Sequence, residues 1–406
     1  MNYTGYNLPN VKIANRSSIL QILTEKGPMA RKDIARELGL TAAAVTQICS
    51  EMMNLGILKE IGELSEEKRA GRKKILIGID YTFAYVLGIS IEISITTISL
   101  ADLKGQCIRK QQIATDADIA PEKFLIECLQ IGKEMIRELK LTRDRILGLG
   151  VSVPGIVSRE DGVSIHAYRI WDTPVEIRRI LELETSLPIL VENNVKAYAE
   201  AELTFGAGRE QENLIFLKWG PGVGSAIVIN NKIYHNRHNA SSEFGHVVIR
   251  RHGGKLCRCG RYGCLETEVS THAIRDAVRS RLSAETMPLL WKYLDGDSSR
   301  LHAGNIREWA EIPDPGMQEV FREILVKLCD ALSDAATILT PDHIIYYGDI
   351  FQLSYFAENF ETVYRHSAGV GYEDGILVES QLKDKISYIG ATAIVCNEKL
   401  LRKNDG

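Results

Sequence analysis

The stretch EFGHVVIRRHGGKLCRCGRYGCLE, residues 243–266, places three of the chain's eight cysteines within eight positions, and a histidine lies eleven residues before the first of them. Clustered cysteines in a chain without a secretory signal indicate metal binding before disulfide formation. Three thiolates and one imidazole complete a closed tetrahedral shell, and soft sulfur donors favour zinc over magnesium or calcium. The sequence therefore predicts a structural Zn²⁺ site, the alternative being reduced cysteines in an ordinary loop. The predicted ligands are His246, Cys257, Cys259 and Cys264.

The bulk composition around this stretch is that of a globular protein with two or three domains. The chain has 406 residues, of which 45% are hydrophobic and 25% charged. Its N-terminus lacks the basic-then-apolar layout of a signal peptide, and no apolar run approaches the ~20 residues that cross a bilayer. We therefore expect a cytoplasmic protein with no membrane insertion.

The charge is unevenly distributed along the chain. Residues 1–75 contain 12 Lys or Arg against 8 Asp or Glu, whereas the remainder holds 37 against 45. A basic N-terminal segment followed by an acidic remainder suggests that the N-terminal segment binds a polyanion.

The first 75 residues have the pattern of a winged helix-turn-helix. Apolar residues recur at helical spacing, Gly27-Pro28 ends a first helix, and Gly39 supplies the turn after a second. Thr41 is a suitable N-cap for a third helix. After Gly56, two strand-like segments surround a charged loop, which completes a winged helix.

This arrangement predicts contacts with double-stranded operator DNA. Small residues at the start of the third helix allow close approach to the major groove, and Thr46 and Gln47 can reach base edges. The basic Gly-Arg wing suits a narrow minor groove. The alternative is a three-helix bundle that contacts proteins, followed by a solvated basic linker. The predicted DNA-binding residues are Arg31, Thr41, Ala42, Ala43, Thr46, Gln47, Arg69, Gly71, Arg72, Lys73 and Lys74.

From about residue 76, strand-like and helix-like segments alternate, which predicts an α/β body of two lobes. Within it five motifs follow one another in a fixed order. They are VSVPG (151–155), VENN (191–194), GPGVGSA (220–226), EFGH (243–246) and CRCGRYGCLE (257–266).

These motifs resemble the ROK family (repressor, open reading frame, kinase) over essentially all of residues 76–400, and EFGH with the cysteines is the most specific of them. The segment GPMARKDIARELGLTAAAVTQICSEMMNLGIL, followed by AGRKK, is similar to the N-terminal domain of ROK repressors. The resemblance implies an N-terminal winged helix-turn-helix followed by a two-lobed, actin-like, sugar-kinase-like (ribonuclease H-like) body. The domains expected are 1–75 for DNA binding, 76–200 and 201–380 for the two lobes, and 381–406 for a C-terminal helix packed on the first lobe.

The resemblance also implies a sugar in the cleft between the lobes. Residues that match Glu243, His246 and Glu266 contact the sugar in ROK proteins, and the histidine also holds zinc through one ring nitrogen. The matching asparagine is Asn193, and Asn194 beside it completes the predicted sugar-binding set. Alternatively, the two glutamates only orient the metal ligands.

Two departures from the family pattern argue against an enzyme. ROK kinases have Asn-Asp where this chain has Asn193-Asn194, and a carboxamide is not a useful general base at neutral pH. Their first phosphate loop, Asp-x-Gly-Gly-Thr, aligns with residues 90–94, where Glu92 and Ile93 occupy the glycine places. The surviving GPGVGSA segment is interpreted as a tight turn between strands. We therefore expect no catalytic residues.

The sequence thus predicts a sugar-responsive transcriptional regulator, a repressor, acting as a homodimer or tetramer. The alternatives are a ROK-type ATP-dependent sugar kinase with an appended DNA-binding domain, and a regulator controlled by a protein partner. The effector is a small sugar or a sugar phosphate; Arg169, after the VPG loop, is either a reader of an anionic or larger saccharide or a surface ion pair.

Overall fold

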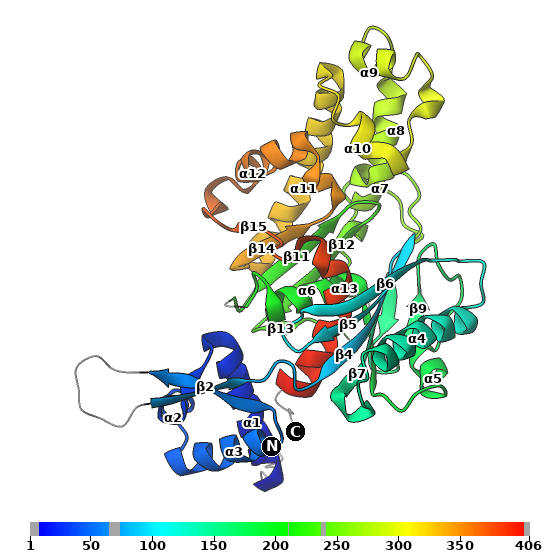
Figure 1. Ribbon diagram of the computed structural model, residues 1–406. Helices are drawn as coiled ribbons and strands as arrows, with labels where there is room; N and C mark the ends of the chain where they lie inside the picture. Colours follow the sequence, from blue (N-terminus) through cyan, green and yellow to red (C-terminus); the bar gives the residue numbers. More distant parts are fainter. Residues whose placement is uncertain (1–7, 65–73, 210, 237–240, 402–406) are drawn as a thin grey trace, which may run out of the picture. The chain divides into compact units, whose positions relative to one another are not determined.

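A computed structural model describes the chain except for residues 1–7, 65–73, 210, 237–240 and 402–406 (Figure 1). The chain forms two compact units. The first comprises residues 1–205 together with 384–406, and the second comprises residues 206–383.

The N-terminal part of the first unit is a winged helix-turn-helix, as predicted. Gly39 ends the second helix in the left-handed conformation (φ +64°), and the hydroxyl of Thr41 caps the third helix by accepting a hydrogen bond from the Ala44 N–H. The buried side chains of the three helices form one small core with Leu58 and Ile77 of the sheet. The elements are α1 (Leu8–Lys26), β1 (Met29–Ala30), α2 (Arg31–Leu38), α3 (Ala42–Asn54), β2 (Leu58–Leu64) and β3 (Lys74–Ile79), with antiparallel strand order β1-β3-β2.

The rest of the first unit is a five-stranded sheet covered by helices on both faces. Its strand order is β10-β7-β4-β5-β6; β10, β7 and β4 are parallel, and β5 and β6 are antiparallel to their neighbours. The elements are β4 (Tyr85–Ile91), β5 (Ile95–Asp102), β6 (Cys107–Ala114), α4 (Pro121–Glu138), η1 (Arg143–Arg145), β7 (Ile146–Val153), β8 (Ile156–Ser158), β9 (Val163–His166), α5 (Ile177–Glu182), β10 (Ile189–Asn193), α6 (Asn194–Phe205), α13 (Ile386–Cys396) and η8 (Asn397–Leu401).

The two faces of this sheet are packed differently. Leu87, Ile89 and Ile91 of β4 point into a core with α4 and α5, whereas the opposite face packs against α6 and α13. On that opposite face the strands carry glycine, because a Cβ on Gly150 would lie 1.9 Å from the Ala391 carbonyl oxygen of α13. The C-terminal helix therefore packs in direct contact with the backbone of β7, close to the N-terminus of α6 (Figure 1).

The second unit is also a five-stranded sheet with helices, in the order β13-β12-β11-β14-β15. Trp219, fully buried at the end of β11, packs edge-on against Phe351 and Phe356 in its main core. The elements are β11 (Leu214–Trp219), β12 (Val223–Ile229), β13 (Lys232–Ile233), η2 (Phe244–His246), α7 (Leu265–Val269), α8 (Thr271–Arg281), α9 (Pro288–Tyr293), η3 (Ser298–Arg300), η4 (Ala303–Asn305), α10 (Ile306–Trp309), α11 (Pro315–Leu339), β14 (His343–Tyr347), η5 (Asp349–Gln352), α12 (Ser354–Ala368), η6 (Gly369–Gly371), β15 (Leu377–Glu379) and η7 (Lys383–Lys385).

The predicted fold class is confirmed: a winged helix-turn-helix precedes an α/β body. Among the described residues, no helix is both long and apolar enough to cross a bilayer.

Candidate functional site

The predicted metal ligands come together in the second unit, where they form a histidine–cysteine cluster. One ligand atom from each of His246, Cys257, Cys259 and Cys264 lies within 4.8 Å of all the others. The Cys259 and Cys264 sulfurs are 3.6 Å apart, and the Cys257 sulfur lies 3.4 Å from Nδ1 of His246. A tetrahedral zinc shell with Zn–S bonds of ~2.3 Å separates its sulfurs by about 3.8 Å. This cluster therefore fits a metal ion in both donor chemistry and spacing.

The loop between η2 and α7 has little regular secondary structure. Two isolated antiparallel bridges, Val248–Cys264 and Leu256–Tyr262, and a tight turn between Cys257 and Arg261 hold it. At Gly263 (φ +71°) an added Cβ would lie 1.8 Å from the Arg250 carbonyl oxygen, so only glycine fits there. Backbone hydrogen bonds across these bridges and this turn bring the thiols together.

The protonation of the three thiols shows what a cation would contribute. Burial raises the pKa of Cys264 to about 12 and also raises the pKa of Cys257. At Cys259 burial acts in the same direction, but hydrogen bonds from Arg261 outweigh it and lower the pKa of that thiol. Since only thiolates ligate metals, a bound cation must displace protons from Cys257 and Cys264.

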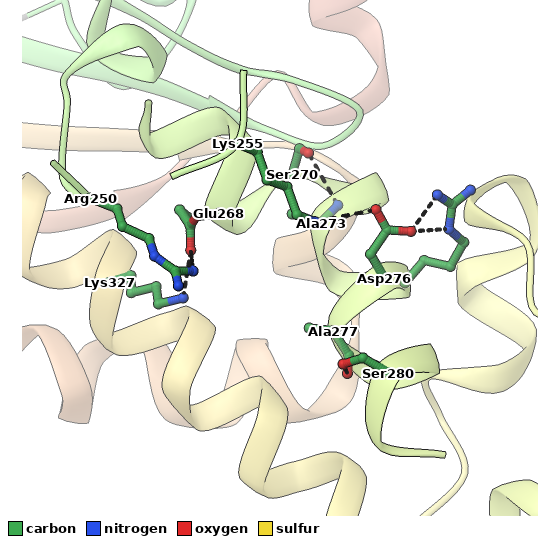
Figure 2. Close-up of polar contacts among 10 residues, drawn as sticks. Arg250, Lys255, Glu268, Ser270, Ala273, Asp276, Ala277, Ser280 and Lys327 are labelled. Atoms are coloured by element: carbon green, nitrogen blue, oxygen red, sulfur yellow. Dashed lines mark hydrogen bonds and ion pairs between the residues drawn. The ribbon is translucent and has the colours of Figure 1, made fainter. Parts of the chain in front are cut away.

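Ion pairs attach the same loop to the helices of the second unit, as Figure 2 shows. Glu268 of α7 is buried, and its Oε2 lies 2.9 Å from Nζ of Lys327 on α11 and 3.6 Å from Nη1 of Arg250 in the loop. A second pair joins Lys255 of the loop to Asp276 of α8 at 3.5 Å, and Arg275 also binds Asp276. Two cationic residues in the first half of the loop are therefore held by carboxylates on α7 and α8.

The predicted sugar-binding carboxylates flank this cluster. Oε2 of Glu243 lies 3.8 Å from Nε2 of His246, on the opposite side of the ring from Cys257. Oε2 of Glu266 accepts a hydrogen bond from the Val223 N–H, and a Cβ on Gly222 would lie 2.8 Å from that oxygen. The glycine-rich turn between β11 and β12 thus makes room for the Glu266 carboxylate. Glu243 lies beside the imidazole that belongs to the cluster.

The predicted asparagines lie in the first unit, where β10 ends and α6 begins. Asn193 accepts from the N–H groups of Val195 and Lys196 and donates to the Gly155 carbonyl in the VPG loop. Its side chain therefore caps the helix N-terminus. Asn194 is buried, and its Nδ2 donates to Oε1 of Glu92 at 2.7 Å. The structure thus groups the predicted sugar residues by unit: the two asparagines in the first, and Glu243, His246 and Glu266 in the second.

A buried ion cluster close to these asparagines was not predicted from sequence. Arg159 lies 3.1 Å from Glu192 of β10 and 3.1 Å from Glu398 of η8. Burial tends to lower the pKa of the guanidinium, but Glu192, Glu200 and Glu398 raise it overall. The cluster ties the C-terminal segment to the strand that carries Asn193. No sequence signal identifies it, because its members are up to 239 positions apart.

The predicted DNA-reading residues of α3 lie on its exposed face. Thr41, Ala42, Ala43, Thr46 and Gln47 are all exposed. The opposite face of the helix packs into the core through Val45, Ile48, Cys49 and Met52. Arg31, which begins α2, is partly buried and lies near Met53. In the predicted wing, Arg69, Gly71, Arg72 and Lys73 fall outside the described residues, and Lys74 begins β3 with its side chain also outside them.

Two basic residues of α1 were missed in the sequence interpretation. Lys12 and Arg16 each lie 2.8 Å from the carboxylate of Glu51 on α3. Side-chain hydrogen bonds from Lys12 and then Arg16 lower the pKa of Glu51. These pairs join the first helix to the proposed reading helix.

The fold and its two clusters define a winged helix-turn-helix protein with an actin-like, sugar-kinase-like body and a histidine–cysteine loop. A winged helix-turn-helix DNA-binding model matches residues 14–59, and the ROK family model matches residues 86–398. The chain belongs to the ROK family.

The relatives include both regulators and kinases. A putative xylose repressor of Caldicellulosiruptor sp. (strain Rt8B.4) is 25% identical, over 96% of this chain and 97% of its own length. The crystal structure of a ROK family transcriptional regulator, a homologue of the E. coli Mlc protein, has a TM-score of 0.79 at 24% identity and covers 97% of this chain and 98% of its own. A ROK family glucokinase from Streptomyces griseus has a TM-score of 0.66 at 23% identity and covers 77% of this chain and 99% of its own.

Proposed function

We propose that the chain is a sugar-responsive, DNA-binding transcriptional regulator that represses carbohydrate-utilisation genes. The observation that carries the proposal is the presence, in one chain, of a winged helix-turn-helix and a ROK body with an amide at the general-base position. The first of these binds DNA, and the second, without a base at Asn194, is suited to recognise a sugar rather than to transform it. The repressor names of relatives along nearly the whole chain support this proposal.

The exposed face of α3 is the proposed reader of the operator. Its small residues leave room for the backbone in a major groove, and Thr46 and Gln47 carry hydrogen-bonding groups to base edges. We propose that Arg31 and the wing residues Arg69, Gly71, Arg72, Lys73 and Lys74 contact the DNA backbone and minor groove. A homodimer or tetramer would present two such heads to a symmetric operator.

The histidine–cysteine cluster is proposed to hold a structural Zn²⁺. Three sulfurs and one imidazole nitrogen fill a tetrahedral shell, so no position remains for an activated water. Glu243 and Glu266 are proposed to bind sugar hydroxyls, together with His246 of the cluster itself and with Asn193 and Asn194 of the first unit. We also propose that the protein works in the cytoplasm, where its thiols stay reduced.

A differential affinity for sugar between the DNA-bound and free states would release the operator. Such couplings are typically worth about 1–3 kcal/mol, or roughly 5- to 150-fold in operator affinity. The test begins with operator fragments selected from genomic DNA by the purified protein. Fluorescence anisotropy on a labelled fragment is then measured across pentoses, hexoses, N-acetylhexosamines and their phosphates. A sugar-dependent change in affinity is expected; its absence for the whole panel would refute the sensor function.

The competing function, a sugar kinase with a DNA-binding domain, has support from kinase relatives such as a glucokinase of Halalkalibacterium halodurans. Purified protein with ATP and a hexose discriminates between the two. We expect no ATP-dependent phosphorylation, because Asn194 offers no base and Glu92 brings a negative charge to a phosphate-loop position. Turnover that Asn194→Ala abolishes would establish the kinase instead.

A further inference from the structure

The two departures from the kinase pattern are in direct contact in the structure. Glu92 follows β4 in the β4–β5 turn, and Asn194 begins α6, 102 positions later. Oε1 of Glu92 accepts one hydrogen bond from Nδ2 of Asn194, at 2.7 Å, and another from the Tyr198 hydroxyl of α6. The two substitutions, separate in sequence, therefore form one hydrogen-bonded group.

This contact fixes the orientation of the Asn194 carboxamide. A carboxylate only accepts hydrogen bonds, so the nitrogen of the amide must face Glu92. Its oxygen accepts from the Val195 N–H at 2.9 Å, at the N-terminus of α6. Glu92 accepts one of the two amide hydrogens, and the sugar-binding role proposed for Asn194 needs the other. The amide cannot flip without losing both hydrogen bonds.

Tyr198 in turn restricts the carboxylate. Its side chain is 1% exposed, and Gly390 of α13 packs so closely that an added Cβ would lie 3.0 Å from the tyrosine ring. The hydroxyl is therefore held in place by the C-terminal helix, and Glu92 receives two fixed donors. Hydrogen bonds to a carboxylate from two donors strongly favour a single geometry.

We propose that Glu92 is a positioning residue for Asn194: the site requires one carboxylate and one amide in contact, and the carboxylate has moved from position 194 to position 92. The inference rests on the proposed function, since the positioned amide serves to bind the sugar. The negative charge is not lost from the site but held by Asn194 and Tyr198. Glu92 thus replaces the phosphate loop with a contact that orders the sugar-facing end of α6.

Four proteins test the pair, and they differ in how many carboxylates stand at positions 92 and 194. The unchanged protein has one, Glu92→Gln has none, Asn194→Asp has two, and the double swap Glu92→Gln/Asn194→Asp has one, at the other position. Tyr198→Phe removes only the second donor. Glu182→Gln, at an exposed position of α5, is the matched control. Each protein is measured by thermal unfolding and by operator anisotropy with D-xylose, D-glucose and N-acetyl-D-glucosamine as probes.

The expected result is a specific pattern. Asn194→Asp lowers the unfolding temperature because two carboxylates are forced together, and the swap recovers it because an amide again faces a carboxylate. The sugar midpoint, which is the sugar concentration at half of the change in operator anisotropy, rises about tenfold or more in Glu92→Gln and in Asn194→Asp. This is the equivalent of one hydrogen bond. It rises less in Tyr198→Phe, and it recovers in the swap relative to Asn194→Asp. Operator affinity without sugar is unchanged in all of them.

Two results overturn the proposal. A swap that recovers neither the unfolding temperature nor the sugar midpoint shows that the two residues are independent. An unchanged sugar midpoint in Glu92→Gln, with coupling seen only in thermal unfolding, shows that the pair is purely structural. If no sugar of the wider panel acts on the unchanged protein, the proposed function on which this inference rests itself fails, whether or not the swap recovers the unfolding temperature.

Discussion

The two groups of residues proposed to bind sugar are held by different physical means. In the first unit, Asn194 begins α6 and Glu92 directly follows β4, so strand pairing and the packing of α6 and α13 hold their backbone. In the second unit, the histidine–cysteine cluster lies in a loop with two isolated bridges, and burial raises the pKa of two of its three thiols, Cys257 and Cys264. The first is ordered by hydrogen bonds between regular elements, whereas the second is proposed to be held by a bound metal as well.

The largest effect that separates the two groups is expected from metal removal. Chelation, or Cys264→Ser, removes the cross-link of the loop, and structural zinc sites typically contribute several kcal/mol or more. We expect the second unit to unfold at a markedly lower temperature and the sugar response to disappear. Metal content by plasma emission and hydrogen exchange resolved along the chain check this. An equal loss of protection from hydrogen exchange in residues 76–205 would show that the first unit depends on the metal as much as the second does.

The next largest effect is expected at Glu268. Its buried carboxylate binds Lys327 and Arg250, whose own side chains are 39% and 55% exposed, so Glu268→Gln leaves no buried charge behind. The substitution should destabilise the second unit by about 2 kcal/mol in chemical unfolding of the metal-loaded protein, the typical worth of a hydrogen bond to a charged group. The matched control is Glu323→Gln on the same helix as Lys327, where the exposed pair with Arg281 should cost less than about 1 kcal/mol. Equal effects would show that the loop does not depend on its buried anchor.

Operator binding by the winged helix-turn-helix is expected to be independent of the metal, in contrast to the stability of the second unit. Gln47→Ala is expected to weaken operator binding by about 1–3 kcal/mol, the typical worth of a good base contact. Thr41→Ala should also weaken it, through the loss of a helix cap, which costs about 1 kcal/mol. Anisotropy on metal-loaded and chelated protein should give the same losses. The control is Gln21→Ala, since the Gln21 side chain hydrogen-bonds Glu25 within α1.

The smallest effect is expected at Asp276, the second anchor of the loop. Burial opposes ionisation there, but Arg275 and Lys255 outweigh it and lower the pKa of the carboxyl. A lowered folded pKa gives stability that is present above the unfolded value, near 4, and lost as the pH falls through the folded value. Asp276→Asn should thus cost less than about 1 kcal/mol at neutral pH, since the side chain is 39% exposed, and nothing in strong acid. The free energy of unfolding of the unchanged protein and of Asp276→Asn is measured from about pH 7 to about pH 2. A difference between the two proteins that grows in acid would contradict this prediction.

Much of this site was predicted from the sequence because its signals are local. The spacing of His246 and the three cysteines predicted their clustering, and helical periodicity with Thr41 and Gly39 predicted α3, the proposed reading helix. The anchors of the metal loop were missed. Glu268 and Lys327 are 59 positions apart and belong to different helices, so neither carries a pattern that marks it as a partner of the other.

The sequence by itself determined which elements form and which residue types gather in the cysteine loop, because periodicity, caps and ligand spacing act over a few residues. Only the tertiary structure decided that Glu92 touches Asn194, that α13 returns to the sheet against Gly150, and that Arg159 joins β10 to the C-terminal segment. These contacts depend on how the chain packs once its apolar faces are buried. Pairings across a hundred or more residues arise from that packing and leave no periodic trace in the chain.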